Sequence, residues 1–558
     1  MKYLFGFLLF VGLVACQSKK SYDVVLKNGT VYDGLGGKPI EADVAISADT
    51  IAAIGKPGEF SGEQEIDVKG LAVAPGFINM LSWATTSLIQ DGRSLGDIKQ
   101  GVTLEVMGEG NSMGPLTQPM KESWQRQIDK EDVKFQISWN TLGEYLNMLE
   151  KKGVSCNVAS FIGAATPRLC VLGPVNRAPK PDELEKMRAY VRQAMEEGAM
   201  GVASALIYVP GIYSRTDELI ALAEEASKYG GMYVSHMRSE GNQIEFAVEE
   251  LITIAKKAKI RSEIYHLKFA GKQNWGKIDK VLARIDQANK DSLHITADMY
   301  TYVAGATGLD AAMPPDIQEG TFEDWQKRLQ DPAIRKRVIQ EMKAPGGNWE
   351  NLYFAAGPDK VLFLAFLQDS LRKYQGKTLA EVAKIRGKSP EETAMDLVIQ
   401  DGTRVEVAYF LMNEDNIKRQ LKLPYLSFCS DASSMAPEGV FLKTSAHPRA
   451  YGNFARLLGK YVRDEKVIPL EDAIRKLTSL PASNLRIQKR GSLQVGNYAD
   501  VVVFDPQQIQ DHATFEKPHQ LATGMVHVFV NGKQVLNNGE HTGAKPGRFV
   551  KGPGFKAK

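Results

Sequence analysis

Four side chains that can bind a metal ion follow strand-like runs of the sequence: Glu109 after TLEVMG, His236 in MYVSH, His266 in SEIYH and Asp431 after LSFCS. In a barrel of parallel strands the C-terminal strand ends meet at one mouth, so these side chains are expected to converge there. Imidazole and carboxylate groups are common zinc ligands. A metal held by such groups would acidify a water molecule and polarise a carbonyl group, which is the chemistry of hydrolysis.

Each of these residues also has a purely structural interpretation. A single histidine at a strand end is more often a hydrogen-bonded core residue than a ligand, Asp431 in SDASS is typical of a helix N-cap, and Glu109 suits a solvated turn. Two histidines at equivalent strand ends favour the metal site over these alternatives. Gly108 and Gly110, on either side of Glu109, predict a tight turn with a close approach of the backbone.

The middle of the chain, which would position these residues, alternates between apolar runs and helical patterns. Residues 181–198 have apolar side chains at helical spacing and end at a glycine, and residues 216–231 follow the same pattern. The strand-like runs are GFIN, GVTLEVM, NVASFIG, MGVASA, MYVSH, SEIYH, HITADM, EVAYF and LSFC. They predict an α/β fold with a metal-dependent (β/α)8 TIM-like barrel over residues 73–488. An open doubly wound sheet is the alternative, although no GxGxxG phosphate loop follows a strand.

A long helical stretch, residues 322–394, interrupts the alternation between two of these strand-like runs. It is longer than an ordinary connection from a strand to a helix, so it is predicted to be an insertion. Such an insertion either covers the barrel mouth as a lid or decorates the surface.

Both ends of the chain are rich in short strands and turn signals. Asn28-Gly29 and Asn531-Gly532 each lie between β-rich runs and predict hairpins. Residues 16–72 and 489–558 are therefore expected to pair into one small β-sandwich domain, formed from both termini.

Residues 1–15 have the pattern of a bacterial lipoprotein signal peptide. Lys2 precedes an apolar stretch that is short for a membrane helix, and Ala15 precedes Cys16. We expect Cys16 to be lipidated, and several acyl chains on one residue would anchor it stably. The body would then lie on the extracytoplasmic side of a bacterial cell envelope. An ordinary cleaved secretory signal is the alternative.

The composition limits the kinds of partner. The 558 residues are 43% hydrophobic and 24% charged, with a net charge of +3. No basic block or patch of interleaved aromatic and basic residues indicates a nucleic-acid partner. A hydrolase of small molecules and a protein-binding scaffold both remain compatible with this composition, and the sequence does not indicate an oligomeric state.

Several longer segments, taken in order, resemble one family. They are GVTLEVMGEGNSMGP, GVASALIYVPGIYSRTDELIALA, YVSHMRSEG, YHLKFAGKQNWG, SDASS, AHPRAYGNFARLLGKYV, RGSLQVGNYADVVVFDP and GEHTGAKPGRFV. Over nearly the whole chain after the signal segment, they are similar to the N-acyl-D-amino-acid deacylases (D-aminoacylases) of the amidohydrolase superfamily. The resemblance implies a metal-binding (β/α)8 barrel with a small β-sandwich built from both termini.

The resemblance also implies roles for the candidate residues. His236 and His266 would hold one tightly bound zinc ion, and Asp431 would act as the general base and acid. The third ligand is a cysteine in the typical deacylase, in Gly-Asn-Cys-Gly, where this chain has Gly-Glu-Gly-Asn. We expect Glu109 to take its place, and a carboxylate could shift the metal preference towards manganese or iron.

Further residues would bind the substrate. By the same resemblance, Lys268 contacts the substrate, Arg449 binds its carboxylate, and either Tyr300 or Tyr302 is the substrate-binding tyrosine. Each has a structural alternative, either as part of a surface salt bridge or as a core hydroxyl.

The chain departs from the family at a second place. The family has His-x-His after the first barrel strand, where this chain has Leu81-Ser82-Trp83. That pair serves a second, weaker metal site, so its loss predicts an enzyme with one metal ion. Leu81 and Trp83 are expected to fill the space with apolar bulk.

The expected activity is hydrolysis of the amide bond in small-molecule N-acyl-D-amino acids or similar D-configured substrates. Two alternatives remain open. One is a hydrolase of cyclic amides or dipeptides, because substrate class depends on loops more than on fold. The other is a metal-free, lipid-anchored binding protein, which the missing His-x-His motivates.

Overall fold

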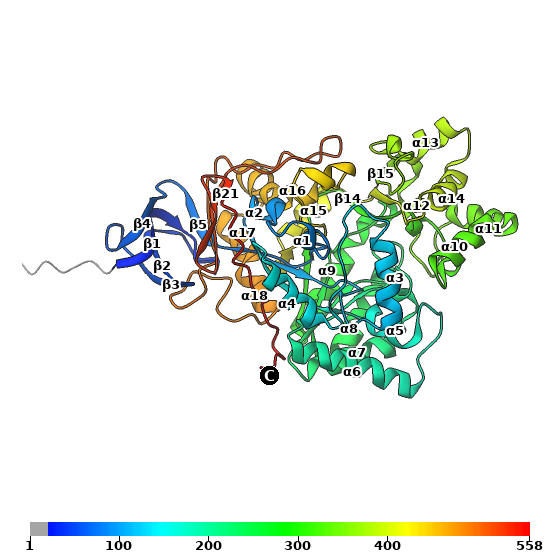
Figure 1. The fold of residues 1–558 in the computed structure, drawn as a ribbon, viewed down its shortest axis with the longest axis horizontal. Coiled ribbons are helices and arrows are strands. Elements are labelled where there is room, and N and C mark those ends of the chain that lie inside the picture. The colour runs from blue at the N-terminus through cyan, green and yellow to red at the C-terminus, as the bar shows by residue number, and fades with distance from the viewer. Residues whose placement is uncertain (1–20, 558) are drawn as a thin grey trace, which may run out of the picture.

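The computed structural model describes residues 21–557, so the predicted signal peptide and Cys16 lie outside the described residues. Within this range the strands form four sheets: one of nine strands built from both ends of the chain, two parallel sheets, and a small antiparallel sheet (Figure 1). Among residues 21–557, no helix combines the length and the apolar character that crossing a membrane requires.

The two parallel sheets provide the strand ends on which the candidate residues lie. One contains β6 (Phe77–Asn79), β7 (Val102–Met107) and β8 (Asn157–Ser160). The other has the order β17-β13-β12-β11-β10-β9, with β9 (Ile162–Gly163), β10 (Gly201–Ala205), β11 (Met232–His236), β12 (Arg261–Ile264), β13 (Ile295–Met299) and β17 (Leu426–Phe428).

The edges of these two sheets lie beside each other. Only Phe161 separates β8 from β9 along the chain, and the amide of Met80 donates to the carbonyl of Phe428 at 3.2 Å, which links the ends of β6 and β17. Nearly every residue of these strands is buried, as expected for parallel strands covered by helices.

Helices follow most of these strands, and α6 (Pro181–Glu197) illustrates why the sequence forms them. Pro181 occupies the first turn, Met187 and Val191 are buried on one face, and Gly198 ends the helix with a φ of 109°. Burying such side chains contributes roughly 1.5–3 kcal/mol each. The other helices around the sheets are α1 (Ser87–Gln90), α2 (Leu95–Ile98), α3 (Gln118–Ile128), α4 (Leu142–Lys152), α5 (Ala165–Leu172), α7 (Thr216–Ser227), α8 (Ile244–Ala258), α9 (Ile278–Lys290), α15 (Glu414–Leu421), α16 (Arg449–Arg456), α17 (Leu470–Leu477) and α18 (Ser479–Asn484).

The two ends of the chain meet in the nine-stranded sheet at one end of the molecule (Figure 1). The antiparallel pairing of β5 (Ala72–Pro75) with β18 (Val501–Phe504) joins them. The other strands are β1 (Ser21–Val31), β2 (Ile40–Ser47), β3 (Thr50–Gly55), β4 (Ser61–Asp67), β19 (Met525–Val530), β20 (Lys533–Asn537) and β21 (Glu540–His541). The expectation that both termini build one β-rich unit agrees with this pairing.

One of the two predicted hairpins is confirmed and the other is wrong. Asn531 and Gly532 connect β19 to β20 with φ angles of 48° and 75°. Asn28 and Gly29 instead lie inside β1, at a register shift that continues the strand. A Cβ on Gly29 would come within 2.5 Å of Val73, so close packing against β5 explains this glycine.

The region of the predicted insertion contains more than a helical stretch. Besides α10 (Phe322–Gln330), α11 (Pro332–Met342), α12 (Leu352–Ala356), α13 (Leu379–Arg386) and α14 (Pro390–Asp401), it contains an antiparallel sheet of β14 (Ala304–Gly308), β15 (Val361–Ala365) and β16 (Glu406–Phe410). The run EVAYF, expected among the barrel strands, is β16 of this sheet, which corrects that prediction.

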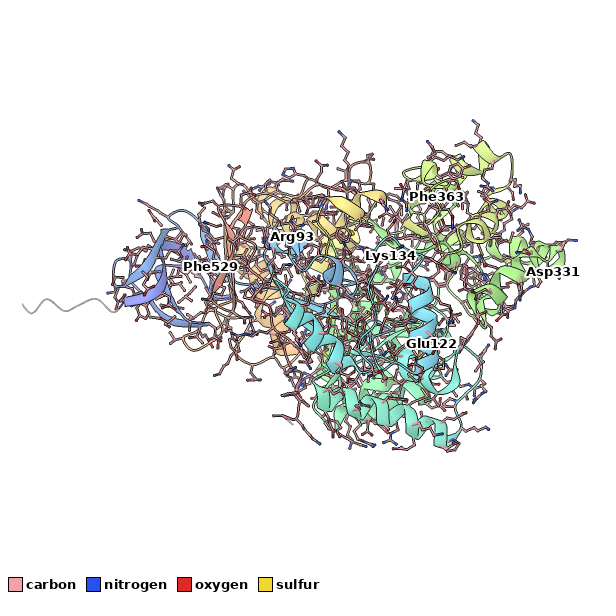
Figure 2. All side chains as sticks on the ribbon, viewed as in Figure 1. Arg93, Glu122, Lys134, Asp331, Phe363 and Phe529 are labelled. Carbon is pink, nitrogen blue, oxygen red and sulfur yellow. The ribbon has the colours of Figure 1, made fainter. Side chains whose placement is uncertain are left out.

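The insertion has an apolar core of its own. Phe363 belongs to this core and Phe529 to that of the terminal sheet, and they lie at opposite ends of the molecule (Figure 2). An apolar strand that pairs and packs within such a unit has the same sequence pattern as a barrel strand, so periodicity could not separate them.

Candidate metal centre and substrate cavity

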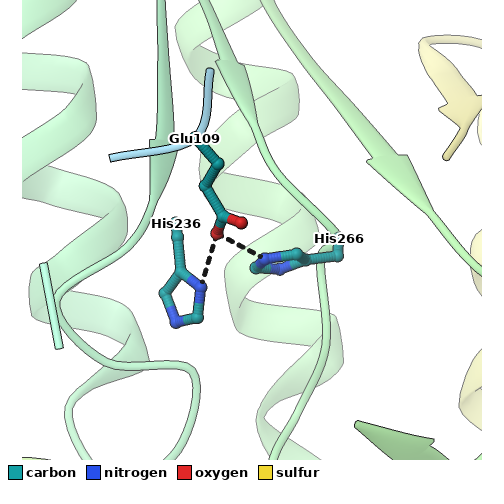
Figure 3. Close-up of side chains that lie close together, drawn as sticks. All are labelled: Glu109, His236 and His266. Carbon is teal, nitrogen blue, oxygen red and sulfur yellow. Dashed lines mark hydrogen bonds and ion pairs between the residues drawn. The ribbon is translucent and has the colours of Figure 1, made fainter. Parts of the chain in front are cut away.

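Glu109, His236 and His266 form a buried cluster, with each side chain reaching it from a different strand end (Figure 3). Nδ1 of His236 lies 3.0 Å, and Nε2 of His266 3.2 Å, from the same oxygen of Glu109, Oε1. The candidate ligand atoms all lie within 4.8 Å of one another. One ion with bonds of about 2 Å can bridge atoms at this spacing.

The turn that carries Glu109 depends on its two glycines, as the sequence predicted. Gly108 and Gly110 have φ angles of 106° and 63°. A Cβ on Gly108 would lie 2.2 Å from the carbonyl oxygen of Phe161, and one on Gly110 would lie 2.6 Å from the Cβ of Ala205. Any side chain at either position would therefore displace Glu109 from the cluster.

Two candidate residues hold unusual backbone conformations. His266 and Asp431 have φ angles of 34° and 47°, in the left-handed region that side chains other than glycine rarely adopt. Hydrogen bonds compensate for the strain: the amide of His266 donates to Oδ1 of Asp298 at 2.7 Å, and the amide of Asp431 donates to the carbonyl of Leu81 at 2.9 Å. Strain of this kind gathers where a side chain must face a site.

The residues of the cluster fit a metal ion. Two imidazoles and a carboxylate match the donor set of catalytic zinc sites. Within the described part of the chain, the buried Nε2 of His236 has no hydrogen-bond partner. Burial alone would raise the pKa of Glu109, but hydrogen bonds from the two histidines hold it well below its usual range. The carboxylate is therefore ionised and available as a ligand.

A second carboxylate, Glu240, completes the surroundings of the cluster, and sequence reasoning missed it. Its oxygens lie 2.9 and 3.0 Å from Nζ of Lys268, and Oε1 lies 2.9 Å from Nδ1 of His266. Burial and Lys268 lower the pKa of His266, but Glu240 and Glu109 outweigh them and raise it to about 10. The spacing His236-x-x-x-Glu240 could have indicated this residue.

Asp431 lies beside the cluster and pairs with a cation. Its Oδ2 is 2.8 Å from Nη1 of Arg449, and both side chains are largely buried. The Arg449 guanidinium stacks 4.5 Å from the centre of the Tyr300 ring. The structure thus places the expected base and the expected carboxylate-binding arginine in direct contact.

The two candidate tyrosines differ in position. Tyr300 lines the cavity, and among the described residues its buried hydroxyl has no hydrogen-bond partner. Burial raises its pKa to about 12, so the hydroxyl stays a donor. Tyr302 does not line the cavity and donates to the carbonyl of Pro448 at 3.4 Å. The structure therefore favours Tyr300 over Tyr302 as the tyrosine that meets a ligand.

Trp83 is more than apolar bulk, which corrects the expectation for this position. Leu81 is fully buried in an apolar cluster, as expected. Trp83 instead remains 37% exposed towards the cavity, and its indole N–H lies 3.0 Å from Oε2 of Glu109 and 3.2 Å from Oδ1 of Asp431.

The metal cluster and most of the side chains around it open into one cavity of about 980 Å³. The candidate residues that line it are Trp83, Glu109, His236, Glu240, His266, Lys268, Tyr300, Asp431 and Arg449. The insertion supplies part of the wall through Phe322, Trp325, Leu352 and Phe366. It therefore contributes to the site and does not only decorate the surface.

Comparison with known proteins places this site in a family. Residues 375–536 match the model of the amidohydrolase family. The chain is 31% identical over 535 residues to the D-aminoacylase of Alcaligenes xylosoxydans xylosoxydans, covering 96% of this chain and 98% of the relative. The chain belongs to the N-acyl-D-amino-acid deacylase family of amidohydrolases. The family predicted from the sequence is confirmed.

Solved deacylase structures support the same assignment for the fold. The chain matches N-acyl-D-glutamate deacylase of Bordetella bronchiseptica, complexed with zinc and a phosphonate mimic of the tetrahedral intermediate, with a TM-score of 0.79 and 27% identity. It also matches a D-aminoacylase structure with a TM-score of 0.77 and 31% identity. That D-aminoacylase has a binuclear metal centre, in which one metal activates and the second attenuates. Each match covers 95% of this chain and 100% of the other. This chain shares the mixed α/β amidohydrolase fold with both of these structures.

Proposed function

We propose that this deacylase hydrolyses the amide bond of N-acyl-D-amino acids or similar D-configured small molecules. One observation carries the proposal: the cluster of Glu109, His236 and His266 opens into the same cavity as Asp431 and Arg449. This arrangement provides a metal site, a base and a group for a carboxylate side by side. When bound, a metal ion would supply an activated water and an electrophile for the scissile carbonyl.

The protein's own groups can move the proton and hold the substrate. Asp431 is placed to accept a proton from the attacking water and to pass it to the leaving nitrogen. Arg449 now pairs with Asp431, so an incoming carboxylate must take over this guanidinium. That exchange would free Oδ2 of Asp431 when substrate is bound. The bidentate geometry of arginine suits a carboxylate.

Two further groups orient the substrate. The Tyr300 hydroxyl, unpartnered within residues 21–557, can donate to the substrate carbonyl. Lys268 is held by both oxygens of Glu240, which fixes its ammonium at the cavity wall. The carboxylate at Arg449 and the carbonyl near the cluster define two points of the substrate. The cavity wall can then distinguish the third substituent, and this would give selectivity for the D-configuration.

The metal and the architecture complete the proposal. We propose one tightly bound zinc ion on Glu109, His236 and His266, with manganese or iron as alternatives. We also propose that the parallel strands close into a (β/α)8 barrel over residues 73–488, and that residues 16–72 and 489–558 form a small β-sandwich. The hydrogen bond from Met80 to Phe428 supports closure of the parallel strands, and the pairing of β5 with β18 supports a terminal unit that extends as far as Pro75. Lipidation of Cys16 and an extracytoplasmic, membrane-anchored location remain proposals from the sequence.

The decisive experiment measures amino-acid release from matched N-acetyl-D and N-acetyl-L substrates by zinc-loaded protein, with a chelator control. We expect chelator-sensitive release from the D series alone. Equal release from both series would contradict the proposed stereochemistry. Release from neither, in protein that holds metal, would point to cyclic amides or dipeptides. Absence of both release and metal would indicate a binding protein.

A further inference from the structure

Trp83 connects the candidate metal ligand to the candidate base. Its single indole N–H lies within hydrogen-bond distance of Oε2 of Glu109 and of Oδ1 of Asp431, at 3.0 and 3.2 Å. These carboxylates follow β7 and β17, the strands on either side of the one that Trp83 follows, β6. One neutral donor therefore bridges two acidic groups from separate elements.

Hydrogen bonds fix the main chain that carries this indole. The amide of Trp83 donates to the carbonyl of Ala432 at 2.9 Å, and its carbonyl accepts from Oγ of Ser433 at 3.1 Å. On the other side, the amide of the neighbouring Ser82 donates to the carbonyl of Val106 at 2.8 Å. The main chain at Trp83 is thus tied to both flanking strands, and the two carboxylates that the indole N–H contacts follow those same strands.

Like charges in a buried site repel each other, and Glu109 and Asp431 each have a partner of their own: the two histidines contact Glu109, and Arg449 pairs with Asp431. Trp83 contacts both carboxylates. Leu81, the other nearby side chain from this segment, is fully buried and apolar and offers no ligand. Trp83 offers a donor but no lone pair for a metal. Trp83 therefore donates to both carboxylates, and neither Leu81 nor Trp83 can be a ligand of a metal ion.

We propose that the Trp83 N–H takes the place of a second cation between Glu109 and Asp431, so that the centre holds one metal ion, and that it orients Asp431 as a positioning residue. The inference rests on the function proposed above. Trp83 holds Oδ1 of Asp431, whereas Arg449 holds Oδ2. When a substrate carboxylate takes over Arg449, the bond from Trp83 remains and keeps the base aimed at the reacting water.

Three variants test the proposal in the full-length protein. Trp83→Phe keeps an aromatic ring, although a smaller one, and removes the N–H. Trp83→His supplies an imidazole beside the two carboxylates, and Leu81→His with Trp83→His supplies two. Trp275→Phe is the matched control. The indole N–H of Trp275 also donates a hydrogen bond, to the carbonyl of Leu411 at 2.8 Å, but Trp275 does not line the cavity.

The first readout is the number of zinc ions per chain after loading and desalting, measured by plasma mass spectrometry. We expect one ion for the wild type, Trp83→Phe and Trp275→Phe, and a second ion for the double histidine variant. If that variant does not fold, because Leu81 is buried, Trp83→His alone should take up a second, weaker ion. Two ions in the wild type, or no additional ion in any folded histidine variant, would overturn the proposal.

The second readout separates kcat from KM. Loss of the N–H should lower kcat about ten- to a hundredfold, because a small displacement of a reacting group is costly, and leave KM within a few-fold. Trp275→Phe should match the wild type in both constants. Unchanged kcat in Trp83→Phe would refute the positioning role. If the wild type cleaves no N-acyl-D-amino acid, the proposed function fails, but the metal counts still decide whether the residue at position 83 sets the number of bound ions.

Discussion

Replacing Asp431 with asparagine tests whether its carboxylate is the general base, because the substitution changes one oxygen atom to an NH2 group. The carboxylate accepts on Oδ1 from Trp83 at 3.2 Å and pairs on Oδ2 with Arg449 at 2.8 Å. Asparagine has the same size but only one acceptor oxygen, so its NH2 group must face one of these two donors. It also cannot take a proton from water. Asp431→Asn should therefore fold and bind metal, yet fail in turnover.

The magnitude follows from the two roles of this side chain. Removing a positioned general acid–base typically costs about 10²–10⁴ in rate. That corresponds to roughly 3–5 kcal/mol of barrier, at 1.36 kcal/mol for each factor of ten. Breaking a buried ion pair costs about 3–5 kcal/mol of stability. Because the side chains of Arg449 and Asp431 keep 5% and 10% exposure, the loss of stability should lie near the lower end of that range.

The assay combines kcat, metal content and thermal unfolding of the purified variant. Asp511→Asn is a matched control, because Asp511 pairs with Arg456 at 3.2 Å and lies outside the cavity lining. It should lose stability without losing kcat. The metal content of Asp431→Asn should equal that of the wild type, since Asp431 lies outside the cluster of Glu109, His236 and His266. Wild-type turnover in Asp431→Asn would refute the assignment of the base, and loss of the metal would refute the separation of base and ligands.

The same cluster leads to three more predictions. Because the pKa of His266 is raised to about 10, a metal must displace its proton. Apparent zinc affinity should thus rise with pH, by about tenfold per unit for one proton, and chelator competition that finds no pH dependence would contradict this. Glu240→Gln removes the charged partner of Lys268 and His266 and should weaken zinc binding about 10- to 100-fold, measured by the same competition. Tyr300→Phe should lower kcat/KM and leave the melting temperature near that of wild type, because its hydroxyl bonds to no described residue.

The sequence alone indicated the candidate groups for the chemistry and the kind of element that presents them. Glu109, His236, His266 and Asp431 all lie at or just after the ends of short buried strands, and parallel strands bring such ends to one edge. The glycines around Glu109 indicated a tight turn for the same local reason, since φ angles and close contacts there exclude a side chain. The family resemblance rested on these local segments as well.

Only the tertiary structure decided how those groups pair. Glu240 joins the site because the chain after β11 brings it to Lys268 and His266, and Trp83 bridges two carboxylates from other strands. The strand EVAYF belongs to the insertion because its pairing partners lie there. A residue's type and periodicity reveal its local conformation, but hydrogen-bond partners and strand neighbours distant in sequence are set by packing. The sequence therefore indicated the candidate ligands, and the fold decided which neighbouring groups contact each of them.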